Sequence, residues 1–353
     1  MNYILMEYVD KSNYCASSKA RDDVVTILKD RGAEFVPLFR AKSGHFRVFA
    51  QMIGAFLGLA KRVKKGDIIY IQYPYNPQRV NDVLIKRLNK LAKKNSAELC
   101  VIMHDINSFR YSCENEREEA LKEECKLLSR ANSLIVHNRR MKELLNKYGC
   151  SNDIMTELQL FDYIYDGLDA TTEYRSESVK VIVAGNLARE KSGYLYNLPQ
   201  INNISFELFG VNYSGSENTM INYHGAFPPD ELIQFLKGSF GLVWDGNSAE
   251  TCEGNYGLYL KYNNPHKFSL YVASGIPVIV WKQSALADFV ESENIGVAID
   301  SLQDLNKIPV TVSNDDYIVM KNNIERVKNE VRKGWFLKNA LDKSELKINM
   351  EAF

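Results

Sequence analysis

Short apolar runs alternate with longer amphipathic segments throughout the first half of the chain. The runs have the length of strands and are rich in β-branched and aromatic residues, whereas the segments between them repeat apolar positions every three or four residues, as helices do. Strands are therefore expected at 3–9, 34–38, 67–73, 98–104 and 133–137, and helices at 19–31, 47–63, 81–95 and 115–130. Strands that are apolar on both faces are typical of a parallel sheet covered by helices.

A polar stretch at 162–178 has no clear period and is interpreted as a linker, after which the alternation starts again. Strands are expected at 179–184, 205–210, 222–224, 241–244, 277–281 and 296–299, and helices at 230–237, 266–273, 285–291 and 314–333. The sequence thus predicts an α/β protein with domains at 1–165 and 166–335, and a tail at 336–353 that packs back on the first domain. A cleft is expected between the domains. Ligands of open α/β sheets bind beyond the carboxyl ends of the strands, so the loops there are the candidates for chemistry.

Composition narrows the class of protein. A length of 353 residues suits about two domains. The 44 lysines and arginines balance 44 aspartates and glutamates, which argues against a protein that binds nucleic-acid backbones. The six cysteines have no C-x-x-C spacing and form no metal-ligand pattern with the histidines. The N-terminus resembles a strand and not a signal peptide, so a cytoplasmic protein with reduced thiols is expected.

The first strand of the second half ends in a glycine turn followed by cations. Gly185 lets the backbone turn tightly, and Asn186, Arg189 and Lys191 follow it. A helix that begins here would present free N–H groups, together with Arg189 or Lys191, to a phosphate. The alternative is an ordinary glycine turn with solvated cations. Neither the G-x-G-x-x-G spacing nor a Walker loop is present.

A second candidate anion site precedes the strand at 277–281. Asn264 suits an N-cap and Pro265 the first helical position. Lys267 would then lie in the first turn, where a cation opposes the helix dipole unless an anion is bound, which favours a diphosphate. A solvated surface lysine explains the pattern equally well. His266 is interpreted as a capping or packing residue and not as a metal ligand.

Two further loops carry groups suited to sugars and hydroxyls. The polar loop after the strand at 241–244 contains Asp245 and Glu250, whose carboxylates could bind sugar hydroxyls or simply face solvent. The strand at 98–104 ends at His104 and Asp105, a position suited to a general base. The alternative is that Asp105 caps the next helix while His104 packs.

Two basic segments of the first half could meet other molecules. Lys19 and Arg21 open the first helix and would face the cleft. The segment from Phe46 to Lys65 has a broad apolar face and ends in four cations, so it could lie on the inner face of the plasma membrane. A core helix with a solvated end explains the same pattern.

Several short motifs together point to a known family. They are Lys19-Ala20-Arg21-Asp22, His104-Asp105-Ile106, Ala184-Gly185-Asn186-Leu187-Ala188-Arg189, Phe209-Gly210-Val211-Asn212-Tyr213, Trp244-Asp245-Gly246, Tyr262-Asn263-Asn264-Pro265-His266-Lys267 and Gly275-Ile276-Pro277-Val278. With them the sequence resembles bacterial galactofuranosyltransferases of O-antigen and capsule clusters, a GT-B glycosyltransferase family. It resembles more distantly the streptococcal glucosyltransferases that extend GlcNAc on serine-rich adhesins. The likeness covers most of the chain.

The resemblance implies a GT-B fold of two Rossmann-like domains with parallel sheets facing a central cleft. It places UDP against the second domain, between the loop at 185–189 and Lys267, and the acceptor in the first domain, on the side of Lys19 and Arg21. Backbone groups at 224–227, which include Gly225 and Phe227, would hold the uracil. Neither a metal nor another cofactor is implied, because Arg189 and Lys267 would neutralise the departing diphosphate.

One departure from related enzymes bears on the stereochemistry. Many retaining GT-B enzymes carry two glutamates eight positions apart before the Gly-x-Pro strand, where this chain has Tyr262 and Leu270. The sugar contacts would then fall to Asp245 or Glu250. This departure favours an inverting enzyme, with Asp105 as the first choice of base and His104 as the second.

The expected function is transfer of galactofuranose from UDP-galactofuranose to a hydroxyl of a lipid-linked surface-polysaccharide glycan. One alternative is a UDP-glucose-dependent glucosyltransferase that acts on a glycoprotein or polysaccharide. Another is a non-catalytic subunit that binds sugar nucleotides. The sequence leaves the acceptor, the linkage and a homo-oligomeric state open.

Overall fold

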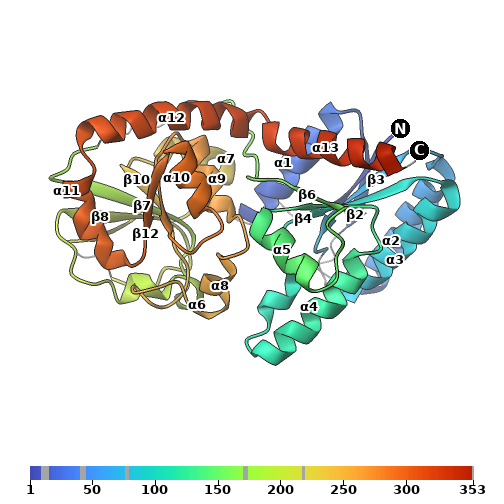
Figure 1. Cartoon of the computed structure of the whole chain (residues 1–353), viewed down its shortest axis with the longest axis horizontal. Helices are drawn as coiled ribbons and strands as arrows, with labels where there is room; N and C mark the ends of the chain where they lie inside the picture. Colours follow the sequence, from blue (N-terminus) through green and yellow to red (C-terminus); the bar gives the residue numbers. More distant parts are fainter. Residues whose placement is uncertain (9–15, 40–44, 76–78, 170–173, 217–218, 352–353) are drawn as a thin grey trace. The chain divides into compact units, whose positions relative to one another are not determined.

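In a computed structural model the chain is described over residues 1–8, 16–39, 45–75, 79–169, 174–216 and 219–351. It divides into two units, one formed by residues 1–12, 21–159 and 336–353 and the other by residues 13–20 and 160–335. Each unit contains a six-stranded sheet, and the paired strands run parallel (Figure 1). The α/β class predicted from the alternating pattern is confirmed.

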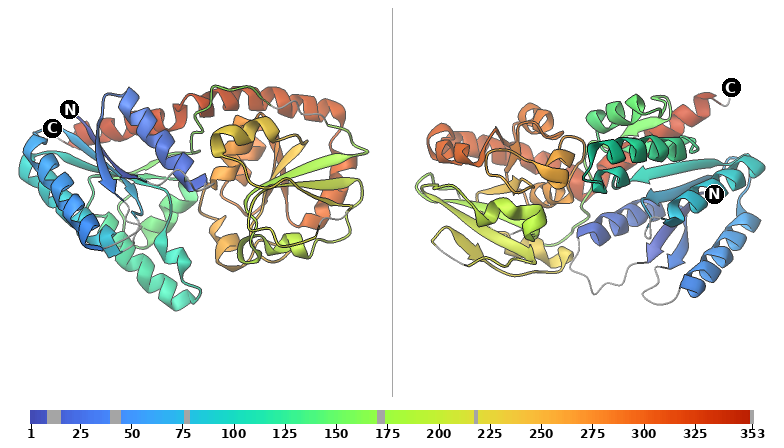
Figure 2. Two further views of the ribbon diagram at one scale, coloured as in Figure 1. Left: turned by 180° about the vertical axis from the view of Figure 1, so that it is seen from behind. Right: turned by 90° about the horizontal axis from the view of Figure 1, so that it is seen from below.

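The sheet of the first unit has the strand order β2-β1-β3-β4-β5-β6. Its strands are β1 (Tyr3–Tyr8), β2 (Glu34–Phe39), β3 (Ile68–Tyr73), β4 (Glu98–Met103), β5 (Ser133–Val136) and β6 (Met155–Glu157). Its helices are α1 (Ala16–Asp30), α2 (His45–Arg62), α3 (Arg79–Asn95), the 3-10 turn η1 (Asn107–Arg110), α4 (Glu114–Leu128), α5 (Arg139–Lys147) and α13 (Trp335–Glu351). Helices α1 and α13 lie on one face of the sheet, and α2, α3 and α4 lie on the other (Figure 1 and Figure 2).

The C-terminal helix α13 is held on the first unit by polar contacts. The hydroxyl of Tyr70, a buried residue of β3, donates to Glu345 at 2.9 Å. The guanidinium of Arg31, just after α1, lies 2.8 Å from Asp342. Ser133 of β5 hydrogen-bonds Ser344. The tail therefore completes the covering of this sheet.

The sheet of the second unit has the strand order β12-β11-β10-β7-β8-β9. Its strands are β7 (Val179–Asn186), β8 (Ile204–Val211), β9 (Ile221–Tyr223), β10 (Phe240–Val243), β11 (Val278–Trp281) and β12 (Gly296–Ile299). Its helices are α6 (Arg189–Ser192), α7 (Pro229–Leu232), α8 (Gly254–Tyr259), α9 (His266–Ala273), α10 (Ala287–Glu293), α11 (Ile308–Thr311) and α12 (Asn314–Arg332), with 3-10 turns η2 (Gly193–Tyr196), η3 (Ile233–Phe235) and η4 (Leu302–Lys307). The strands β7, β9 and β10 are each followed by a loop that carries candidate residues.

Some elements of the structure were not predicted from the sequence pattern, and the bounds of others differ from the prediction. It did not show β6, a strand of three residues, or α5, whose N-terminus is capped by the Asn138 side chain. The helix expected at 230–237 is a single turn, α7, followed by a 3-10 turn. Asn264 is not the cap of α9: Pro265 is extended at that position, and its carbonyl accepts from Phe268 N.

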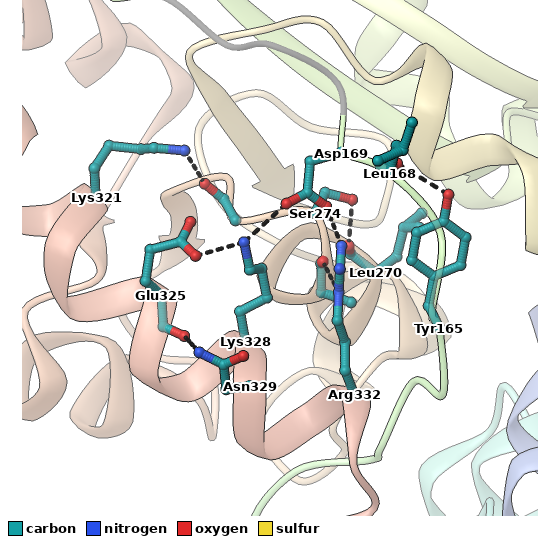
Figure 3. A network of polar contacts seen from close by, with 12 residues as sticks. Tyr165, Leu168, Asp169, Leu270, Ser274, Lys321, Glu325, Lys328, Asn329 and Arg332 are labelled. Carbon is teal, nitrogen blue, oxygen red and sulfur yellow. Dashed lines mark hydrogen bonds and ion pairs between the residues drawn. The ribbon is translucent and has the colours of Figure 1, made fainter.

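A cluster of ion pairs ties the stretch before residue 170 to α12 within the second unit (Figure 3). The carboxylate of Asp169 accepts hydrogen bonds from Lys328, at 2.8 Å, and from Arg332. Arg332 also donates to the carbonyl of Ala273 at the end of α9, at 2.8 Å. Partial burial would raise the pKa of Asp169, but the two cations outweigh it and hold this pKa below its ordinary value. The cluster fixes α9, the helix that carries Lys267.

Candidate functional site

A pocket of about 510 Å³, open in part to solvent, lies at the carboxyl ends of β7 and β8 in the second unit. Strand ends supply Ala184, Gly185, Phe209 and Gly210, and most of the other lining is apolar. The remaining lining residues are Tyr163, Ala226, Phe227, Pro229, Leu232, His266, Lys267 and Leu270. The mostly apolar walls with few polar groups are those of a small-molecule site. Its position is the one expected for a ligand of an open α/β sheet.

Two glycines at the ends of β7 and β8 line this pocket. Gly185 and Gly210 are partners in the β7–β8 pairing, and both have positive φ, +128° and +156°. A Cβ added to Gly210 would overlap the carbonyl oxygen of Gly185, whereas one added to Gly185 would meet no atom within 4 Å. Close approach of the backbone therefore requires a glycine at position 210 but not at position 185.

We expect Gly210→Ala to lower the melting temperature by about 5–10 °C, because overlap with a backbone oxygen must be relieved by separating the two strands, at about 2–4 kcal/mol. Thermal unfolding followed by circular dichroism checks this. Gly185→Ala is the matched control, since it carries the backbone strain without the overlap. It should lower the melting temperature clearly less than Gly210→Ala does. Equal losses in the two variants would contradict the role given to close approach.

The loop after β9 forms one wall of the pocket. The backbone N–H of His224 donates to Leu208 O at 2.9 Å, and Gly210 N donates to Gly225 O at 2.8 Å. These bonds run the loop alongside β8 and bring Ala226 and Phe227 to the pocket. The Phe227 ring stacks on Phe235, with centroids 4.3 Å apart. The candidate residues Gly225 and Phe227 are thus both placed at or beside this wall.

Lys267 lies at the start of α9 and lines the pocket, where it is held by the end of β10. Its ammonium is 2.8 Å from the carboxylate of Asp245 and donates to Trp244 O at 3.0 Å. The side chains are only 9% and 5% exposed, respectively, for Lys267 and Asp245. Burial lowers the pKa of Lys267 below its ordinary value and neighbouring Lys191 adds to this, while Asp245 opposes it. Lys267 is therefore a fixed, largely buried cation and not a solvated surface lysine.

The two sugar-binding candidates lie in different surroundings. Asp245 is buried and its carboxylate faces Lys267, so its first role is to balance that cation. Glu250 is exposed and accepts from Gln303 at 2.8 Å. The buried ion pair was not visible in the sequence, because Asp245 follows β10 whereas Lys267 lies in α9.

Arg189 and Lys191, the two cations of the loop after β7, also lie in different surroundings. Arg189 is exposed and its guanidinium lies over the Tyr196 ring, 4.0 Å from the centroid. Lys191 is half-buried and lies close enough to Lys267 to lower the pKa of that residue. Its carbonyl accepts from Gly246 N at 2.7 Å, which ties this turn to the loop that carries Asp245. Lys191, which the sequence left as an alternative to Arg189, is thus the one associated with the buried pair.

Two asparagines of the predicted site shape its loops. Asn186 is exposed, and its side-chain oxygen accepts from Ala188 N at 3.1 Å and from the Asn212 side chain at 2.9 Å. Asn264 is buried, two residues before α9. The first arranges the turn after β7, and the second lies at the entry to the helix that carries Lys267.

His266 packs against an aromatic ring of the second unit. Its ring stacks on Tyr163 with centroids 5.1 Å apart, and burial, reinforced by Lys19, lowers its pKa to about 3. Lys19 itself is buried against the same tyrosine, 4.9 Å from the ring centroid, and donates to Ile164 O at 2.7 Å. Within the described ranges, no group of three or more His, Cys, Asp or Glu side chains is arranged to hold a metal ion.

In the first unit, His104 and Asp105 follow β4 and are both half-buried. Nε2 of His104 lies 2.7 Å from the side-chain oxygen of Gln72, and Gln72 donates through its NH₂ group to Arg21 O at 3.3 Å. Because that second bond orients the amide, the Gln72 oxygen faces His104, and Nε2 must carry the proton. The Arg21 guanidinium donates to Pro74 O at 2.6 Å, which ties α1 to the end of β3.

Sequence reasoning missed Glu124, a buried carboxylate of α4 behind this loop. It accepts from the Tyr73 hydroxyl at 2.7 Å and from the backbone N–H groups of Asn107 and Ser108 at 2.8 and 2.9 Å. Burial raises the pKa of Glu124. Its contacts hold η1, the turn just after Asp105. The one signal in the sequence was its place beside the apolar positions Leu121, Cys125 and Leu128, in a segment crowded with other charges.

The segment proposed to meet a membrane is α2 and the residues after it. Phe46 and Phe49 have side chains outside the described residues. Phe56 is half-buried and Leu57 is 55% exposed, while Lys61, Lys64 and Lys65 face solvent. Among the described helices, none combines the length and apolar character required to cross a bilayer.

Comparisons with known proteins agree with this architecture. The sequence matches the Glucosyltransferase 3-like N-terminal domain over residues 1–160 and the Glucosyltransferase 3-like C-terminal domain over residues 181–344. It is 36% identical over 246 residues to the beta-1,6-galactofuranosyltransferase WbbI of Escherichia coli (strain K12), covering 68% of this chain and 69% of that protein. It is 24% identical over 292 residues to Glucosyltransferase 3 of Streptococcus gordonii, covering 80% of each.

A solved structure shows the same fold. HepE of Anabaena, crystallised in complex with UDP, superposes with a TM-score of 0.54 over 100% of this chain and 99% of that chain, at 13% identity. The two parallel sheets and these similarities establish the GT-B architecture. The chain belongs to the Glucosyltransferase 3-like family and is a glycosyltransferase with the GT-B fold.

Proposed function

We propose that the pocket at the ends of β7 and β8 binds the UDP moiety of a sugar-nucleotide donor. The observation that carries this proposal is the buried ammonium of Lys267 in an otherwise apolar pocket lined by Phe209 and Phe227. Aromatic rings suit the flat base, and the backbone of the loop at 224–227 suits its polar edge. A fixed cation with Lys191 nearby suits a diphosphate. HepE, which is similar in fold, was solved with UDP.

The same lysines would make a metal unnecessary. Cleavage of the sugar–phosphate bond leaves negative charge on the diphosphate, and a preorganised cation in a water-poor site stabilises that charge without rearranging. Lys267 is preorganised because Asp245 and Trp244 hold its ammonium. We therefore propose metal-independent catalysis, with Lys267 and Lys191 facing the departing phosphates.

The transfer itself is proposed to invert the anomeric centre in one displacement. The acceptor hydroxyl oxygen forms the new bond to the anomeric carbon, the bond from that carbon to the diphosphate oxygen breaks, and the hydroxyl proton passes to Asp105. Tyr262 and Leu270 stand where many retaining relatives of this fold carry glutamates, which supports inversion. His104 is the second choice of base, because its Nε2 is engaged by the side-chain oxygen of Gln72.

The proposed donor is UDP-galactofuranose, and the proposed acceptor is a hydroxyl of a lipid-linked surface-polysaccharide glycan. The similarity to WbbI, a beta-1,6-galactofuranosyltransferase, supports the sugar. The exposed Leu57 and the lysines that follow α2 are consistent with an acceptor held near a membrane surface.

A donor panel tests this proposal. UDP release would be measured with UDP-galactofuranose, UDP-galactose and UDP-glucose, each with the same set of octyl hexosides as acceptors. We expect turnover with UDP-galactofuranose at least about 10²-fold above the other two, since pockets that hydrogen-bond sugar hydroxyls discriminate strongly. Preferred turnover of UDP-glucose would instead establish the second candidate, a glucosyltransferase, which the family match and Glucosyltransferase 3 of Streptococcus gordonii favour. Binding of UDP without any turnover would favour a non-catalytic subunit.

A further inference from the structure

A buried carboxylate with no place in the proposed chemistry lies behind the aromatic wall of the pocket. Glu207 belongs to β8, and its side chain is 8% exposed. It accepts hydrogen bonds from the Ser205 hydroxyl at 3.1 Å, from the Asn222 amide at 3.0 Å and from Nε2 of His224 at 2.7 Å. Three donors converge on one carboxylate, so this is a built arrangement and not a chance surface contact.

His224 connects this carboxylate to the pocket. Glu207 and Phe209 are two residues apart on one strand, so their side chains lie on the same face of the sheet. The imidazole of His224 bonds Glu207 and stacks on the Phe209 ring, with centroids 4.6 Å apart and planes at 18°. Phe209 lines the pocket, and the residues that follow His224 form the adjoining wall. The His224 side chain thus contacts both the Glu207 carboxylate and the Phe209 ring, and the loop that forms the adjoining wall begins at this residue.

We propose that Glu207 and His224 are positioning residues for the base of the nucleotide. The carboxylate fixes the imidazole, the imidazole fixes the Phe209 ring, and the loop at 224–227 is held where its backbone can meet the polar edge of the base. The proposal rests on the proposed function, because it assigns the base to this wall. A wall that is ordered before binding lowers the ordering cost of binding, so the effect belongs to donor affinity and not to the chemical step.

Calorimetric titration with UDP and with inorganic pyrophosphate tests the assignment, since pyrophosphate has no base. We expect Glu207→Ala to bind UDP about tenfold more weakly and pyrophosphate within about twofold of the unmodified protein. Glu207→Gln keeps hydrogen-bonding capacity and should bind UDP within about threefold. In turnover, Glu207→Ala should raise KM for the donor and leave kcat unchanged. His224→Ala, at a side chain that is 40% exposed, should give the same pattern if Glu207→Ala does not fold.

Asp304→Ala is the matched control. Its carboxylate also accepts three hydrogen bonds, from Asp300 N, Ser301 N and Lys307, but it follows β12 at the opposite edge of the same sheet. It should leave both affinities unchanged. Equal weakening of UDP and pyrophosphate by Glu207→Ala, or unchanged UDP binding, would overturn the inference alone. Failure of the unmodified protein to bind UDP would overturn the proposed function and this inference together.

Discussion

Replacement of Lys267 with alanine is expected to lower turnover by about 10²–10³-fold and to weaken UDP binding by about 10- to 100-fold. The ammonium is largely buried, lines the pocket and is fixed by two oxygen atoms, so no solvent cation can take its place in the same geometry. Pre-steady-state turnover and calorimetric titration with UDP measure the two losses separately. A loss confined to UDP affinity would show that Lys267 binds donor and transition state equally.

The same change removes the partner of a buried carboxylate, which costs stability as well. We expect a loss of about 3–5 kcal/mol of unfolding free energy, because Asp245 is left uncompensated. The double variant Lys267→Met with Asp245→Asn removes both charges and should recover most of that stability without recovering turnover. Recovery of turnover in the double variant would show that Lys267 acts only by holding the fold together.

The second large effect is expected at Asp105. Asp105→Asn should lower turnover by about 10²–10⁴-fold while UDP affinity stays within about twofold, because the amide cannot accept the proton of the acceptor hydroxyl. The residue belongs to the first unit, so its loss leaves the UDP pocket unchanged. A rate measurement at saturating donor, together with calorimetric titration, gives both quantities.

His104→Gln is the matched comparison for Asp105→Asn. The two residues are neighbours after the same strand, but Nε2 of His104 is engaged by the side-chain oxygen of Gln72. We expect His104→Gln to lose less than about tenfold in turnover. If His104→Gln instead abolishes turnover while Asp105→Asn retains it, the base is His104 and the assignment must be reversed.

Much of the fold could be predicted from local pattern. Apolar runs without alternation predicted the buried parallel strands, and period and length predicted most of the longer helices, although α5 and the C-terminal helix α13 were not predicted. The short elements escaped because they lack a period: β6 has three residues, and α7 forms a single turn. The Pro265 position was misassigned by one residue, since a proline suits either side of a helix start.

The candidate site could be predicted only in part, because its interactions join distant segments. Glycine and lysine positions in single loops were visible in the sequence, and the structure brings Gly185 and Lys267 to one pocket. No sequence pattern linked Asp245 to Lys267, or Glu207 to His224, since the two residues of each pair lie in different segments of the chain. Tertiary packing brings the partners of a buried ion pair together, so the pairing cannot be identified from local sequence pattern.

The most direct measurement is a crystal structure of the protein soaked with UDP. We expect the uracil to lie against Phe209 and the loop at 224–227, and the diphosphate to lie within hydrogen-bond distance of the Lys267 ammonium. UDP bound away from the ends of β7 and β8, or a diphosphate that does not approach Lys267, would contradict the proposed donor site.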